Sequence, residues 1–271
     1  KVELNLQAHF PDARILRLDA VAFVWKEIGT PCIHLPETHE IVKLLRDVVN
    51  AVEPCCLLLS ETNVPNEENL SYFGAGDEAH MVYNFALPPL VLYTFYREDA
   101  TVLSNWAGSL VEPSDAATFF NMLDTHDGVG LMGVREILPR EEIDFIVEKA
   151  KEKGAYISYK MTEARTEEPY EINTTWWSAI NREGDDESLA MQVKRYVASR
   201  SIALVLKGIP GIYTHGAIEN TNEVIRKQGI DLRLGPARVV GQRAVALDRD
   251  RVDRDPFRAV HRRGPDLCCR L

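Results

Sequence analysis

The chain has 271 residues, of which 45% are hydrophobic and 27% are charged, and its formal net charge at pH 7 is −10. This composition is that of an ordinary globular protein with one large domain or two small ones. The negative charge argues against a nucleic-acid or anionic-membrane partner. No apolar run approaches the roughly 20 residues needed to cross a bilayer.

The cysteines carry a weaker signal about redox compartment. None of the five has the spacing of zinc ligands. The pair that leads into an apolar run is expected to be reduced and buried, which favours a cytoplasmic location. The five residues are Cys32, Cys55, Cys56, Cys268 and Cys269.

The first predicted element is a strand at residues 15–19, inside the nearly continuous apolar run Ile15–Trp25. Such runs are typical of strands buried in parallel sheets. Only Arg17 and Asp19 interrupt its first half, and their spacing puts both side chains on the same side of a strand. The pair is open to two interpretations, a structural ion pair or a catalytic carboxylate kept ionised by its arginine.

A helix is predicted over residues 36–52, where apolar residues recur at helical spacing, with Thr38 as a possible cap and Pro54 after its end. Acidic and imidazole side chains gather near its start. Because they do not form a His-Glu-x-x-His motif, solvated polar residues are favoured over a metal site. These residues are His34, Glu37, His39 and Glu40.

Further buried strands are predicted downstream. They lie near residues 57–60, 82–85, 119–123 and 203–206. Acidic residues follow two of them, as Glu61 and as Asp127 after His126. Acids at the carboxyl ends of successive strands are typical of the active site of a (β/α)₈ barrel.

The segments that connect the predicted strands agree with an α/β fold class. Helices are predicted at 139–154 and 186–202, and an aromatic-rich segment at 88–108 should pack a helix against the sheet. Residues 62–80 are predicted to be a polar loop. The long segment 155–185 is either part of the site or a connector whose tryptophans, Trp176 and Trp177, only pack.

Four stretches carry a family resemblance. They resemble glycoside hydrolase family 13, the α-amylase superfamily, and within it the subfamily of sucrose phosphorylases and glucosylglycerate phosphorylase-like members. The resemblance covers roughly residues 12–234. The stretches are Arg17–Gly29, Glu61–Pro65, Leu123–Gly130 and Gly208–Tyr213.

The resemblance implies a retaining reaction in which Asp19 is the nucleophile, Glu61 the acid/base and Asp127 the transition-state stabiliser. Glu61 follows an apolar run and has no cation close in sequence, so its pKa is expected to be raised, as a general acid requires. The partners would be a small α-glucoside and inorganic phosphate as co-substrate, with no cofactor and no metal. Substrate-binding roles are implied for Arg17, His126, Tyr170 and Asn173.

The same resemblance implies a partial barrel, comprising about strands 4–8 and truncated at its N-terminal side. We expect residues 1–234 to be the C-terminal part of the catalytic barrel and residues 235–271 to be an irregular tail, disordered or non-native. The chain by itself is expected to be inactive. Alternatives are an α-glucosidase-type hydrolase of the same superfamily, a non-enzymatic remnant, and an unrelated enzyme that uses Asp19 and His126 as metal ligands. The acceptor and the oligomeric state stay open.

Overall fold

The computed structural model describes residues 14–213, with gaps at 112–113, 115, 163–164 and 182–186. The expected tail at 235–271, and the boundary that separates it from the barrel segment, lie outside the described residues. Within them, no helix is long and apolar enough to span a bilayer.

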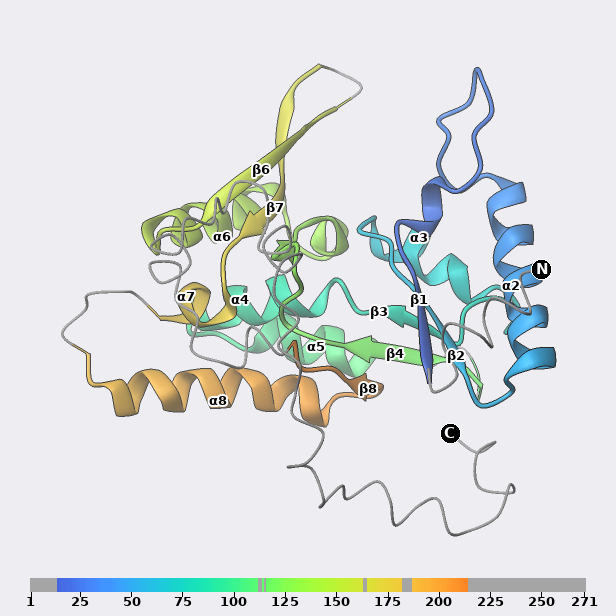
Figure 1. Ribbon diagram of the computed structural model, residues 1–271. Coiled ribbons are helices and arrows are strands. Elements are labelled where there is room, and N and C mark those ends of the chain that lie inside the picture. The colour runs from blue at the N-terminus through green and yellow to red at the C-terminus, as the bar shows by residue number, and fades with distance from the viewer. Residues whose placement is uncertain (1–13, 112–113, 115, 163–164, 182–186, 214–271) are drawn as a thin grey trace, which may run out of the picture.

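A parallel sheet of five strands, in the order β1-β2-β3-β4-β8, organises the fold (Figure 1). This confirms the predicted α/β class. The strands are short and apolar, and β2 and β3 are almost entirely buried. They are β1 (Ile15–Leu18), β2 (Leu57–Ser60), β3 (Met81–Tyr83), β4 (Thr118–Asn121) and β8 (Ile209–Pro210).

A second, antiparallel sheet in the order β5-β7-β6 follows the fourth strand of the large sheet. Its long hairpin projects from the body of the molecule (Figure 1). The strands are β5 (Val129–Gly130), β6 (Tyr156–Met161) and β7 (Glu167–Asn173).

Helices connect the strands. The α-helices are α2 (Pro36–Val52), α3 (Asn66–Leu70), α4 (Leu87–Arg97), α5 (Thr101–Ser109), α6 (Arg140–Glu152), α7 (Trp176–Ile180) and α8 (Leu189–Val205). The short 3₁₀ turns are η1 (Val21–Phe23), η2 (Ser71–Phe73) and η3 (Met132–Val134).

Helix α6 shows why the sequence forms these elements. Its buried residues are spaced along one face, with Glu141 and Glu142 in its first turn and Lys149 and Lys151 in its last. Acids near the N-terminus and lysines near the C-terminus interact favourably with the helix dipole and stabilise the helix. Gly154 follows at φ +84°, a conformation that glycine adopts without strain. Helices α2, α6 and α8 confirm the helices predicted at 36–52, 139–154 and 186–202.

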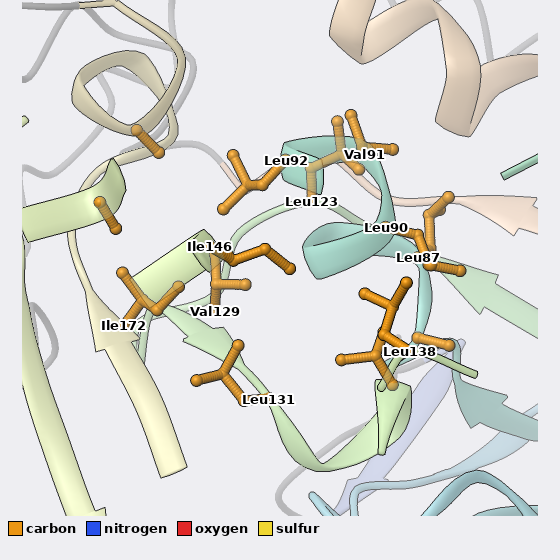
Figure 2. Packing of buried hydrophobic residues seen from close by; sticks show 14 of the residues in the cluster. Leu87, Leu90, Val91, Leu92, Leu123, Val129, Leu131, Leu138, Ile146 and Ile172 are labelled. Atoms are coloured by element: carbon orange, nitrogen blue, oxygen red, sulfur yellow. The ribbon is translucent and has the colours of Figure 1, made fainter. Parts of the chain in front are cut away.

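The main core surrounds α4, whose first six residues are all buried. A helix that is apolar on all sides belongs in an interior. Figure 2 shows α4 side chains meeting residues from β5, β7 and α6. Trp176 is fully buried in this core, and its indole Nε1 donates to Ser199 Oγ at 2.9 Å. Trp177 is also buried, so both tryptophans pack, as one of the two interpretations had it.

The structure corrects four local predictions. Residues 203–206 are not a strand, because helix α8 continues to Val205 and the strand follows as β8. The predicted polar loop 62–80 contains α3 and η2, and the segment 88–108 forms two helices. Thr38 does not cap α2: the cap position is Leu35, and Thr38 Oγ1 is buried with no hydrogen-bond partner among the described residues.

Candidate active site

Asp19 and Glu61 meet at the carboxyl end of the large sheet, where Arg17 joins them. Arg17 Nη1 lies 2.6 Å from Asp19 Oδ1, and Arg17 Nη2 lies 3.6 Å from Glu61 Oε2. The backbone N–H of Ala20 donates to Glu61 Oε2 at 2.9 Å. The Glu61 side chain is 15% exposed, whereas that of Asp19 is 72% exposed.

Local chain geometry brings these groups together. Strands β1 and β2 pair in parallel with Leu18 opposite Ser60, so the residues that follow them lie side by side. Glu61 N donates to Leu18 O at 3.0 Å, and Val21 N donates to Glu61 O at 3.3 Å. Ala20 takes the left-handed conformation at φ 45° and turns its own N–H toward the Glu61 carboxylate. Backbone contacts therefore fix the acid/base candidate beside the nucleophile candidate.

The electrostatics of the two acids differ. Burial raises the pKa of Glu61, against the Ala20 N–H and Arg17, which lower it; Asp19 and Asp127 raise it further. The direction agrees with the expectation from sequence, although the structure does supply a cation, Arg17. The pKa of Arg17 is itself raised: burial lowers it, but the neighbouring carboxylates outweigh burial. The raised pKa of Glu61 suits a general acid, and the ion pair between Asp19 and Arg17 suits a nucleophile.

Asp127 lies in a turn that follows β4. Its backbone N–H donates to Thr125 Oγ1 at 3.0 Å, and its Oδ2 lies 3.2 Å from His126 Nε2. Gly128 follows at φ +94°, and a Cβ there would stand 2.3 Å from Ile172 O. Because β4 runs parallel to β1, β2 and β3, Asp127 follows the same end of the sheet as Asp19 and Glu61, and its charge raises the pKa of both Glu61 and Arg17.

The two predicted substrate-binding residues of β7 have different surroundings. Tyr170 lies beside the site: its hydroxyl donates to Asn63 O at 3.4 Å, and burial, with Glu171 and Glu61, raises its pKa to about 12. Asn173 is buried, and its Nδ2 donates to Ser158 Oγ on β6 at 2.8 Å. The structure thus gives Asn173 a partner within the hairpin.

Sequence reasoning missed a further acid, Glu171. Its Oε1 accepts from Asn63 Nδ2 at 3.1 Å, so β7 is tied to the loop that begins with Glu61. Burial raises the pKa of Glu171 to about 7, and Asp127 and Glu61 add to the shift. The available signal was its position next to Tyr170, in a strand already suspected of lining the site.

A buried ion pair near the site was also missed. Asp124, which ends the run after β4, is 3% exposed and accepts two bonds from Arg200 of α8, at 2.7 and 2.8 Å. Burial raises the pKa of Asp124, and the guanidinium opposes that shift. The pair fixes the chain just before Asp127 to a helix distant in sequence.

Within the described part of the chain, no group of three metal-binding side chains stands close enough to hold an ion. The histidines near α2 have other neighbours. His39 Nδ1 lies 2.8 Å from Glu78 Oε2, and His34 Nδ1 lies 2.9 Å from the hydroxyl of Tyr72.

A parallel α/β sheet with carboxylates gathered where its strands end is the architecture of the (β/α)-barrel carbohydrate-active enzymes. The fold agrees with a solved relative. A sucrose 6F-phosphate phosphorylase from Thermoanaerobacter thermosaccharolyticum superimposes with a TM-score of 0.67 at 26% identity, over 82% of this chain and 42% of that one.

Among curated proteins, the chain is similar to glucosylglycerate phosphorylases and sucrose phosphorylases. The chain is 47% identical over 221 residues to the glucosylglycerate phosphorylase of Spirochaeta thermophila, covering 81% of this chain and 37% of that protein. It is 45% identical over 213 residues to that of Escherichia coli K12, covering 78% and 38%. The sucrose phosphorylase of Streptococcus mutans is 31% identical over 225 residues, covering 81% and 42%. No protein-family profile matches.

The chain belongs to the sucrose and glucosylglycerate phosphorylase family of the α-amylase superfamily. It spans about two fifths of the length of the curated relatives that it matches.

Proposed function

We propose that the chain carries the two catalytic carboxylates of a retaining α-glucoside phosphorylase. The observation that carries this proposal is the bridge of Arg17 between Asp19 and Glu61, in which the Glu61 side chain is largely buried and that of Asp19 is exposed. Relatives named glucosylglycerate phosphorylase support a phosphorylase of that kind.

In the first step, Asp19 attacks the anomeric carbon while the bond to the leaving oxygen breaks. Glu61 gives its proton to that oxygen, and a glucosyl ester forms on Asp19. In the second step, a phosphate oxygen attacks the anomeric carbon, its proton passes to Glu61, and Asp19 leaves as a carboxylate. Two inversions give α-glucose 1-phosphate with retained configuration.

The other residues would act on charge and orientation. Asp127 would stabilise the positive charge that develops on the sugar ring, with His126 beside it to donate to a sugar hydroxyl. Arg17 would pair with the Asp19 carboxylate and hold it in position for attack. Tyr170 and Asn173 are proposed to contact substrate from β7, the latter only if its bond to Ser158 opens.

A chimera tests the proposal. Residues 14–213 would replace the matching span of the E. coli glucosylglycerate phosphorylase, to which the chain is 45% identical over 213 residues. With glucosylglycerate and phosphate, we expect release of glucose 1-phosphate, which Asp19→Asn abolishes. Glu61→Gln should still form the glucosyl ester slowly from α-glucosyl fluoride, because fluoride needs little protonation to leave.

The outcomes separate the alternatives. Release of free glucose at a rate independent of phosphate would favour the α-glucosidase. A chimera that folds but turns over neither glucosylglycerate nor sucrose would contradict the proposal and favour the inactive remnant.

We also propose a cytoplasmic location. Within the described part of the chain, Cys32 and Cys56 are thiols and take part in no disulfide, as expected in a reducing compartment. Localisation of a tagged chain tests this, and secretion would contradict it.

A further inference from the structure

A pocket with a volume of about 190 Å³ lies between η3, the first turn of α6 and strand β7. A cavity of about 150 Å³ is large enough to hold benzene, so this pocket can take a ligand the size of one ring that also carries a small polar group. None of its lining residues is a candidate catalytic or substrate-binding residue. They are Leu131, Arg135, Leu138, Arg140, Ile143 and Pro169.

Most of the pocket wall is apolar. Leu131, Leu138 and Ile143 are buried, and so is Pro169 of β7. Figure 2 labels Leu131 and Leu138 among the residues of the main core. Aliphatic side chains offer no hydrogen bond, so this wall stabilises a ligand through its hydrocarbon part.

The charged groups of the wall are two guanidiniums, Arg135 and Arg140, with no carboxylate among the lining residues. Arg140 Nε donates to Asp144 Oδ1 at 2.9 Å, which is its one side-chain hydrogen bond to another described residue. Because a guanidinium has five N–H donors, the Nη groups of Arg140 can still bind a ligand. The wall therefore combines hydrocarbon with donors that prefer an anion.

One neighbouring carboxylate, that of Glu168, is shared among three cations. It is ion-paired with Arg135, its Oε2 lies 3.9 Å from Arg140 Nη1, and its Oε1 lies 3.7 Å from Lys160 Nζ. Burial and Arg135 lower the pKa of Lys160. The carboxylates of Glu168 and Glu68 oppose this shift without reversing it. The positive charge beside the pocket is therefore only partly offset.

We propose that this pocket binds a small organic carboxylate, with the carboxylate on Arg135 and Arg140 and the hydrocarbon body against Leu131, Leu138 and Ile143. A guanidinium matches a carboxylate through two parallel N–H bonds. The apolar wall favours a carboxylate with a hydrocarbon body over a wholly polar anion such as inorganic phosphate, because only the former gains from leaving water.

Fluorine NMR titrations of the full 271-residue chain test the proposal. The ligand is 4-fluorobenzoate, which joins a carboxylate to a ring. 4-Fluorobenzyl alcohol has the ring without the charge, and inorganic phosphate, used as a competitor, has the charge without the ring. We expect saturable binding of 4-fluorobenzoate with a Kd below about 1 mM, an ordinary efficiency for a ligand of about ten heavy atoms. The alcohol and phosphate should each bind at least about tenfold more weakly.

Two variants that each remove one charge from α6 locate the site. Arg140→Gln should weaken binding of 4-fluorobenzoate by about tenfold, because it removes a charge-assisted contact to the carboxylate. Lys149→Gln changes the last turn of the same helix, outside the pocket lining, and should leave the Kd unchanged. The two side chains are 52% and 40% exposed, so both variants should fold, which urea denaturation checks.

Four results would overturn the proposal. The first is no saturable binding of 4-fluorobenzoate. The second is equal affinity for the alcohol, which would make the pocket a plain apolar cavity. The third is equal affinity for phosphate, which would mean that the apolar wall plays no part. The fourth is the same effect of both variants on the Kd, which would show that the carboxylate does not lie on Arg140.

Discussion

The large sheet is buried around its middle strand, β3, and exposed around its edge strand, β1. Around β3, residues Met81 and Val82 are fully buried, and the first six residues of α4 are buried as well. Around β1, apolar side chains face solvent, and so does Asp19. In the described residues, the core therefore encloses the middle of the sheet and leaves the candidate nucleophile Asp19 in contact with solvent.

The largest expected effect of the open side is on turnover. We predict that the 271-residue chain alone releases glucose 1-phosphate at least about 10²-fold more slowly than a whole relative, because catalysis depends on holding the acids and the sugar within fractions of an ångström. The assay uses sucrose or glucosylglycerate with phosphate. Release above an Asp19→Asn control at a rate near that of a relative would show that the exposed site needs no cover.

Substitutions of two tryptophans test how much the buried core and the exposed β1 edge each contribute to the free energy of unfolding. Trp176→Ala removes a fully buried side chain and its bond to Ser199, so unfolding should become easier by about 3–5 kcal/mol. Trp25→Ala, at the open edge, should change it by less than about 1 kcal/mol. Urea denaturation followed by circular dichroism measures both. Similar losses would mean that Trp25 is covered in solution.

Substitution of Gly128 tests how strongly the turn that contains Asp127 depends on the close approach to Ile172 O. Gly128→Ala places a methyl group against Ile172 O in a left-handed conformation, which should cost about 2 kcal/mol. Gly29 has a similar φ of +90°, and a Cβ added there would meet no atom within 4 Å, so Gly29→Ala is the matched control and should cost only about 1 kcal/mol. Equal losses would show that strain, not the contact, dominates.

Glu171 gives the smallest effect, on the pH dependence of stability. Its pKa is raised to about 7 in the fold, so the folded state holds a proton that the unfolded chain releases near its ordinary value of 4.5. The stabilisation of the folded state by this proton is fully present below pH 4.5 and is lost as the pH rises toward 7. Glu171→Gln should therefore flatten the fall in stability over that window, by on the order of 1 kcal/mol. An unchanged slope would contradict the raised pKa.

Local patterns allowed much of the fold to be predicted. Short apolar runs predicted the strands β1, β2 and β4. Apolar residues at helical spacing predicted the helices α2 and α6. The segment 203–206 did not, because a short apolar run fits a helix end as well as a strand. Only the packing of α8 against β8 and the core decides it.

For the site, sequence could pair Arg17 with Asp19 because they are neighbours in one strand. It could not show that Arg17 also reaches Glu61, since that depends on the register of β1 against β2. Glu171 and Asn63 were missed for the same reason: they are separated by 108 residues, and neither carries a local motif.

The connection from β4 to β8 bears on the order in which the chain folds. Asn121 Nδ2 donates to Lys207 O across 86 residues, and the second sheet with α6, α7 and α8 lies between them. Closing so long a loop is unfavourable until its interior is compact, whereas the β6–β7 hairpin forms from near neighbours. We therefore expect pulse-labelled amides of the hairpin to gain protection before that of Gly211, which bonds Asn121 O. The opposite order would mean that the sheet assembles first.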